Sequence, residues 1–111
     1  MNKNEYVEKI NSIWGGTIYG FNFDLLLHNV VINVVIPSKE DSKFYELRFI
    51  NVFKINFDKN YAKPGWDYVE LLEIHLRKDA SPFIIEIFLW DDEQRLVIEC
   101  ENFEVKSLLK R

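Results

Sequence analysis

Two histidines and one cysteine are the side chains of this sequence with the widest chemical repertoire. His28 and His75 are far apart in the chain, and each lies inside an apolar stretch. Because a metal site needs several His, Cys or carboxylate ligands close together, and Cys100 stands alone, we predict no metal site. His28 is expected to be a core or sheet-face histidine, whereas His75 is expected to face outward beside Glu73.

Nucleophilic catalysis is not indicated either. Cys100 lies between Glu99 and Glu101, whose negative charges would raise the pKa of the thiol, so it is predicted to be a buried structural cysteine. No glycine-rich stretch carries the lysine of a phosphate-binding loop, and no serine lies in a nucleophile-elbow motif.

One carboxylate has the apolar neighbours that a general acid requires. Glu86 lies between Ile85 and Ile87, which is the setting that raises a carboxyl pKa. Alternation with a period of two explains the same residue more simply, as one that points to the outer face of a strand. We therefore predict no catalytic residues and no cofactor, and we expect that the protein is not an enzyme.

The elements that would position any site are mainly strands. Pro82–Cys100 contains two alternating runs around a polar loop, which is typical of a β-hairpin. The β-branched residues of Leu25–Ile36 favour a strand there, and Phe44–Phe57 alternates clearly, although Asn51 on its apolar face predicts a bulge or a hydrogen-bonded amide. Trp66–Arg77 fits a strand better than a helix, but both interpretations remain open.

A single helix is predicted, over residues 3–14. Tyr6, Ile10, Ile13 and Trp14 share one face of a 3.6-residue period, and the glycine pair that follows supplies a stop. Trp14 is expected to anchor this helix in the core.

Composition sets the fold class. A chain of 111 residues with 48% hydrophobic and 15% aromatic residues can bury a core as one domain, without metals or disulfides. We predict a single domain over residues 1–111 that is mainly β (α+β at most). Its antiparallel sheet of about six strands over residues 17–107 is expected to form a sandwich or an open barrel. The oligomeric state stays open.

Charge is concentrated in the second half of the chain. The whole chain has a net charge of −4, but residues 66–104 alone carry −8. Such a surface repels phosphate backbones, so we expect no nucleic-acid partner, whereas it would attract a basic protein. No apolar run approaches the ~20 residues of a transmembrane helix, and the first residues lack the apolar stretch of a signal peptide, so we expect no membrane association and a cytoplasmic location.

Short aromatic segments carry a resemblance to a known family. They follow the predicted helix in the order Ile18–Asp24, Tyr45–Val52, Trp66–Leu71 and Ile98–Phe103. In this order the chain resembles the small bacterial YxiG-like proteins and the related immunity proteins of polymorphic toxin systems. That resemblance implies a cytoplasmic, non-enzymatic antidote that binds and blocks a cognate toxin domain.

An acidic and aromatic surface is the predicted binding site for a basic toxin domain, because acids accelerate the encounter and aromatic residues anchor the complex. Its predicted members are Trp66, Asp67, Tyr68, Glu70, Glu73, Trp90, Asp91, Asp92 and Glu93. The alternative is a structural or regulatory β-domain that binds a small apolar ligand or self-associates through a sheet edge.

Overall fold

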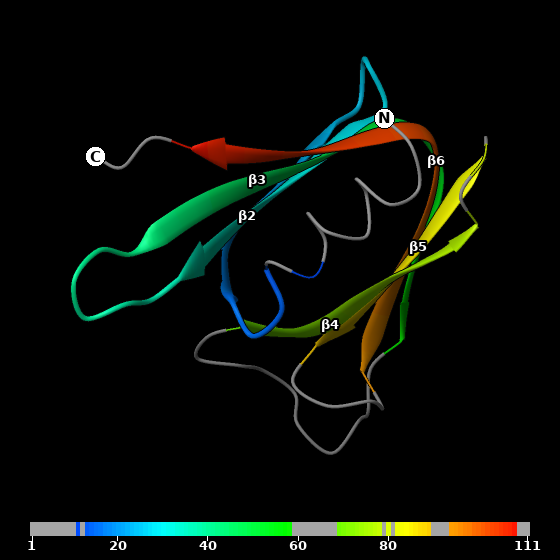
Figure 1. Ribbon diagram of the computed structural model, residues 1–111. Coiled ribbons are helices and arrows are strands. Elements are labelled where there is room, and N and C mark those ends of the chain that lie inside the picture. Colours follow the sequence, from blue (N-terminus) through cyan, green and yellow to red (C-terminus); the bar gives the residue numbers. More distant parts are fainter. Residues whose placement is uncertain are drawn as a thin grey trace.

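Antiparallel strands make up nearly all of the regular structure in the computed structural model, which describes residues 11, 13–58, 69–78, 80, 82–89 and 94–108. The described residues form six strands, in agreement with the predicted number (Figure 1). They are β1 (Thr17–Asp24), β2 (Asn29–Ile36), β3 (Lys43–Asp58), β4 (Val69–Lys78), β5 (Phe83–Leu89) and β6 (Arg95–Leu108).

The strands form one sheet in the order β1-β2-β3-β6-β5-β4. This sheet closes into a barrel where β1 meets β4, so the predicted sandwich or open barrel is wrong. Every pairing is antiparallel, which confirms the predicted mainly β, antiparallel fold. The closing contact is short, because only Thr17 and Ile18 of β1 pair with β4. Gly16 extends it: its carbonyl accepts a hydrogen bond from Leu71 N, and a Cβ at this position would lie only 2.5 Å from Val34 Cγ1.

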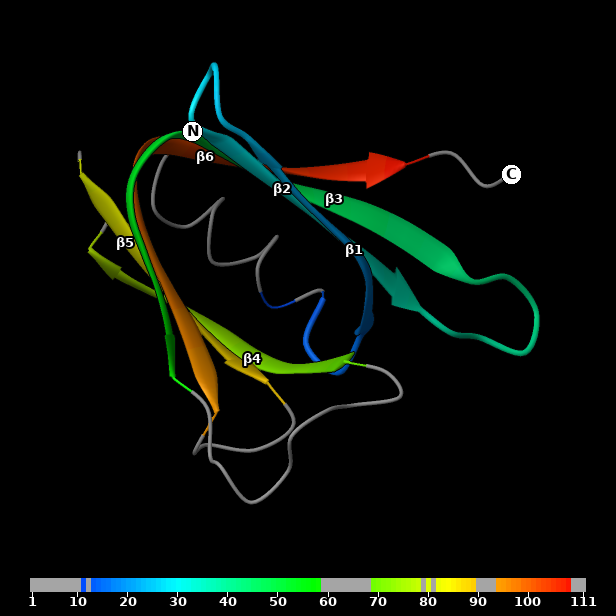
Figure 2. The same ribbon diagram turned by 180° about the vertical axis from the view of Figure 1, so that it is seen from behind.

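Two long strands, β3 and β6, run through both halves of the barrel. The first half of β3 lies between β2 and β6, whereas its second half pairs with β6 alone. Figure 2 shows from behind how the two strands bend together, with β1 and β2 on one side of the bend and β4 and β5 on the other.

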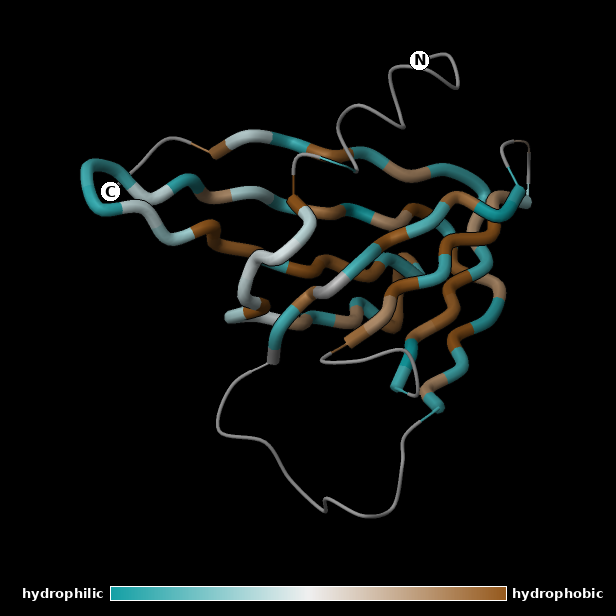
Figure 3. Tube along the Cα trace, turned by 60° about the horizontal axis from the view of Figure 1, so that its bottom comes forward, coloured by the Kyte–Doolittle hydropathy of each residue, from teal (hydrophilic) through white to brown (hydrophobic). Residues whose placement is uncertain are grey.

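Apolar side chains alternate with polar ones along these strands (Figure 3). Phe103 is central to the interior, because its ring lies 6.1 Å from that of Phe49 and 5.9 Å from that of Phe83. The buried hydrophobic residues of the described part are Ile13, Val30, Ile32, Val34, Leu47, Phe49, Leu71, Ile74, Ile85, Ile87, Leu89, Leu96, Ile98, Cys100, Phe103 and Val105.

Most of the predicted strands are confirmed. The hairpin is β5 and β6, and the ambiguous stretch is a strand over Val69–Arg77, within β4. The first strand, β1, begins at Thr17, where the sheet was predicted to begin. Asn51 adopts φ 50°, and its amide is hydrogen-bonded to Glu101, but the register shift in β3 comes just after it, between Val52 and Lys54, so the predicted bulge lies next to Asn51 and not at it.

One predicted strand boundary is wrong. The strand expected over Leu25–Ile36 begins only at Asn29, and the four residues before it form the turn between β1 and β2. His28 is therefore neither a core nor a sheet-face histidine: it lies exposed in this turn with φ 58°. The run of leucines has the composition of a strand, but the hydrogen bonds of the turn described below decide its conformation.

The predicted helix over residues 3–14 lies almost entirely outside the described residues. Ile13 is fully buried, as expected for a residue on the apolar face. Trp14 does dock on the sheet, but it remains 40% exposed and is not a core residue. None of the described residues belongs to a helix that is long and apolar enough to span a bilayer.

Candidate functional site

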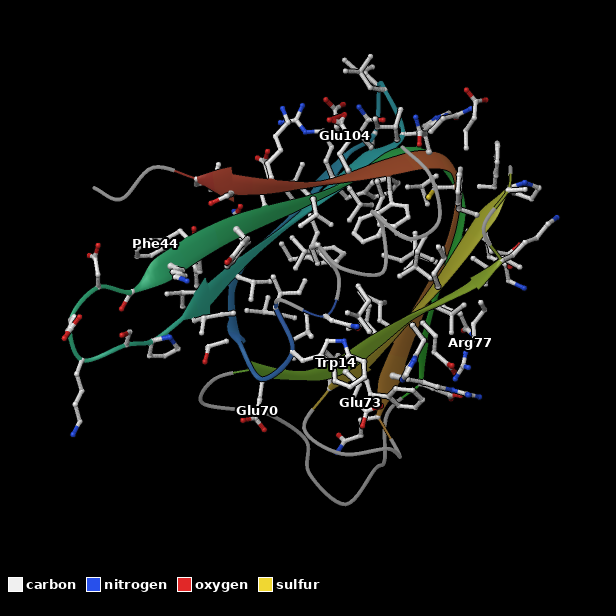
Figure 4. The ribbon with its side chains drawn as sticks, viewed as in Figure 1. Trp14, Phe44, Glu70, Glu73, Arg77 and Glu104 are labelled. Carbon is white, nitrogen blue, oxygen red and sulfur yellow. The ribbon has the colours of Figure 1, made fainter. Side chains whose placement is uncertain are left out.

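The predicted acidic surface falls mostly outside the described residues, which leave out Trp66, Asp67, Tyr68, Trp90, Asp91, Asp92 and Glu93. Glu70 and Glu73 are described, and both lie on β4 (Figure 4). Glu70 is half-buried opposite Thr17, where the barrel closes. Glu73 Oε1 lies 2.8 Å from His75 Nε2, so part of its hydrogen-bonding capacity is already used inside the protein.

His75 faces outward beside Glu73, as predicted. Its ring lies edge-on to two aromatic rings, at 5.4 Å from Trp14 and 5.8 Å from Phe88. The indole Nε1 of Trp14 donates a hydrogen bond to the carbonyl of Ile74, 3.3 Å away. These contacts give His75 a packing role on the outside of β4.

A network of charges lies on the same outer face of β4, β5 and β6. Glu86 is on the outer face, as predicted, but it is only 7% exposed. Arg77 Nε donates to Glu86 Oε1 at 2.6 Å, and Arg95 Nη1 donates to Glu86 Oε2 at 2.8 Å. Arg95 also approaches Asp58 Oδ2 at 3.6 Å.

The two arginines decide the ionisation of Glu86. Burial alone would raise the pKa of this carboxyl, but the hydrogen bonds and positive charges of Arg77 and Arg95 outweigh burial and hold the pKa below its usual value of 4.5. Glu86 is therefore a stable carboxylate, which does not suit the general-acid role weighed from the sequence.

Cys100 is fully buried, and burial raises the pKa of its thiol to about 12. A neutral thiol inside the core is a poor nucleophile and a poor metal ligand. Within the part of the chain that the structure describes, no three His, Cys, Asp or Glu side chains come together in a group that could hold a metal ion.

The turn between β1 and β2 is the most unusual surface feature among the described residues. Leu25, Leu26 and Leu27 follow one another in this turn and are 73%, 93% and 64% exposed. Single exposed leucines are common, but three in a row at a projecting turn form an apolar surface of the kind that marks interaction sites. We call these three residues the leucine turn.

Hydrogen bonds fix the shape of the leucine turn. Asp24 Oδ1 accepts from the backbone N of Leu26 at 3.0 Å and of Leu27 at 3.2 Å, in the pattern of an Asx turn. The carbonyl of His28 accepts from Val52 N at 2.6 Å, which ties the turn to the bend of β3. The leucines are thus held out to solvent by an ordered backbone, which lowers the entropy cost of binding.

The same bend links the turn to β6. Asn29 Oδ1 accepts from the backbone N of Asn51 at 3.0 Å, and Asn51 Nδ2 donates to Glu101 Oε2 at 3.2 Å. Beyond these residues, Glu104 of β6 lies opposite Arg48 of β3 (Figure 4). Carboxylates therefore lie near the apolar turn.

A recess of about 380 Å³ opens at the base of the leucine turn. Arg48 contributes a charged group to it, and Nε of this arginine is buried without a hydrogen-bond partner. Leu27 and Phe23 supply apolar surface to the same recess. The remaining lining residues are Asn22, Asp24, Asn29 and Val31.

The sequence contains a signal for this turn that the strand prediction missed. Asp24 and Asn29 enclose the leucines, and Asx residues at both ends of a short segment favour a turn through side chain to backbone hydrogen bonds.

Comparison with known proteins gives one match. The model of a protein family described as YxiG-like protein matches residues 7–94, about four-fifths of the chain. No curated protein matches the sequence.

Proposed function

This chain belongs to the YxiG-like family, and from that premise we propose that it is a non-enzymatic protein-binding module that neutralises a cognate bacterial toxin domain. The proposal needs no cofactor and places the protein in the cytoplasm. The similarity of its aromatic segments to immunity proteins of polymorphic toxin systems supports the toxin as partner, and the leucine turn supports the mode of binding.

The observation that carries the proposal is the exposure of Leu25, Leu26 and Leu27 on an ordered turn. Exposed leucine side chains leave water only when a partner covers them. Each Å² of apolar surface that is buried in this way stabilises the complex by roughly 25 cal/mol. A turn already held by Asp24 and His28 needs little further ordering on binding. Both properties are typical of the central anchor of a protein interface.

Charge supports a basic partner. Three carboxylates lie near the turn: Asp24 at its start, Glu101 of β6 at the bend of β3, and Glu104 farther along β6. The chain as a whole carries a net charge of −4. Acidic groups at the rim of an apolar contact accelerate the encounter with a basic protein and contribute less to the lifetime of the complex. The acidic surface predicted around residues 66–73 and 90–93 stays a prediction and could add to the same steering.

The test is capture of toxin domains encoded by neighbouring genes, together with growth rescue when such a domain and this protein are expressed together. Leu26→Ser removes the most exposed leucine without touching the core, and it is expected to weaken binding by ~30-fold, as at an interface hot spot. Leu108→Ser is the matched control, since this leucine is also exposed but lies at the far end of β6.

Three results can be distinguished. Loss of capture and rescue in Leu26→Ser, with both retained in Leu108→Ser, supports the proposal. Equal capture and rescue by the two leucine variants would show that the leucine turn is not part of the interface. Loss of capture and rescue in the double variant Glu70→Gln/Glu73→Gln would instead place the interface on β4. Failure of the wild-type protein to bind or protect against any neighbouring toxin domain contradicts the proposed function itself.

A further inference from the structure

An apolar pocket opens between β1 and β2 on one side and the second half of β3 on the other. Its volume is about 300 Å³, and no polar atoms line it. Five strands contribute to its wall, through Ile18, Phe21, Ile32, Ile55, Phe57, Leu89 and Leu96.

The pocket has a buried floor and an open rim. Ile32 is fully buried, and Leu89 and Leu96 are 5% and 7% exposed. Phe21 and Phe57 are each about half exposed, so they form the rim. A molecule that enters would pass between two aromatic rings and rest on aliphatic side chains.

The fold explains why this space exists. The pairing of β2 with β3 ends at Val30 and Phe49, just before the bend at Asn51. Beyond the bend, the described pairing of β3 is with β6, and β2 no longer lies beside it. Among the described residues, Ile55 therefore faces an apolar space in place of a paired strand.

We propose that this pocket binds a small, uncharged, apolar molecule with about the size of one alkyl-substituted aromatic ring. The chemistry follows from the lining, because a charge or an unpaired polar group would lose its hydration without gaining a partner. The size follows from the volume, since an apolar cavity of about 150 Å³ already accommodates benzene and this pocket holds twice as much.

This site is separate from the leucine turn, so the proposal does not depend on the proposed function. Leu25, Leu26 and Leu27 take no part in the lining of the pocket. Binding of a small molecule should therefore survive a change in the turn.

The experiment is a titration of the full chain with toluene, which dissolves in water well enough to span the expected Kd, followed by amide chemical shifts in NMR spectra and by the shift in melting temperature. Saturable shifts are expected for residues around Ile32, Ile55 and Leu96, with a Kd of ~0.1–1 mM for a ligand of this size. Benzoate, the charged probe, should produce none of these shifts at the same concentrations.

Two variants test the location. Ile55→Trp fills the pocket from the wall and should abolish binding, whereas Val35→Trp adds the same indole on the outer face of β2 and should leave binding unchanged. Phe21→Ala removes the exposed rim residue on β1 and should weaken binding several-fold, so it tests the site even if Ile55→Trp does not fold.

Leu26→Ser should bind toluene as the wild type does. The absence of saturable shifts in the wild-type protein overturns the proposal, as does unchanged binding in Phe21→Ala or equal binding of benzoate.

Discussion

Glu86 shows how strongly a single charged residue can depend on its neighbours. It is nearly inaccessible to solvent on an outer sheet face, and it is held there as a carboxylate by Arg77 and Arg95, whose side chains are themselves about half exposed. Forming a buried ion pair contributes little net stability to a fold. Removing one member is costly, because the other charge is then left buried without its partner. The network fixes β4, β5 and β6 relative to one another on the outside of the barrel.

Replacing Glu86 by Gln should destabilise the protein by about 1–2 kcal/mol at neutral pH, less than the loss of one partner from a fully buried pair, because both arginines reach solvent. The folded-state pKa of Glu86 lies below 4.5, so its contribution is complete above that value and is lost as the pH falls through the folded pKa. Urea unfolding of the two proteins should thus differ at neutral pH and converge in acid. Glu40→Gln, in the exposed loop after β2, is the control, and an equal effect of both changes would contradict this role.

Cys100 should be inert in the folded protein. It is fully buried with a thiol pKa near 12, so iodoacetamide at mildly alkaline pH should label it only after unfolding in urea. Mass spectrometry of native and unfolded samples makes the comparison within one protein. Rapid labelling of the native state would show that the thiol is accessible and ionised, against the structure.

The bend shared by β3 and β6 is the element on which the shape of the barrel depends. On β3 the inward side chains step from Phe49 to Val52, and on β6 they step from Cys100 to Phe103, so both strands change face at the same level. Asn51 lies at this level with φ 50°, and its side chain bonds to Glu101 of the neighbouring strand. Two coupled irregularities allow one sheet to fold over the core without losing its pairing.

Asn51→Val should destabilise the protein by about 1–3 kcal/mol, because a β-branched residue tolerates positive φ poorly and cannot bond to Glu101. Asn51→Gly should cost less, since glycine accepts this φ although it also loses the amide. Asn56→Val is the control at an exposed, extended position of the same strand. The order of the three melting temperatures is the measurement, and a Gly variant less stable than the Val variant would contradict the importance of φ.

At the scale of the whole molecule, the described residues form a closed sheet with two apolar surfaces that reach solvent. The leucine turn projects from the end of β1, and the apolar pocket opens beneath β1 against the second half of β3. Both arise at the same place in the fold, where β3 leaves β2. A projecting turn suits a macromolecular partner, whereas a recessed pocket suits a small molecule.

Regular alternation made most of this fold predictable. In β5 the residues Ile85, Ile87 and Leu89 are buried, and the first half of β6 buries every second residue, so the hairpin follows from the sequence. The burial of Glu86 on the other face of β5 does not follow from this alternation. The closure between β1 and β4 could not be predicted from the sequence, because it depends on backbone pairing of Thr17 and Ile18 with residues far along the chain. The leucine turn was missed for a different reason: three apolar residues resemble a strand, but hydrogen bonds from the backbone of Leu26 and Leu27 to the side chain of Asp24 hold them in a turn.

The most direct test of the binding account is hydrogen–deuterium exchange of the protein alone and in complex with its toxin domain. Residues 25–28 lie in an exposed turn, so their amides should exchange readily in the free protein and become protected in the complex. β2, already paired on both sides, should change little. Protection confined to β4 and β5, with residues 25–28 unchanged, would contradict the account and return the interface to the acidic surface.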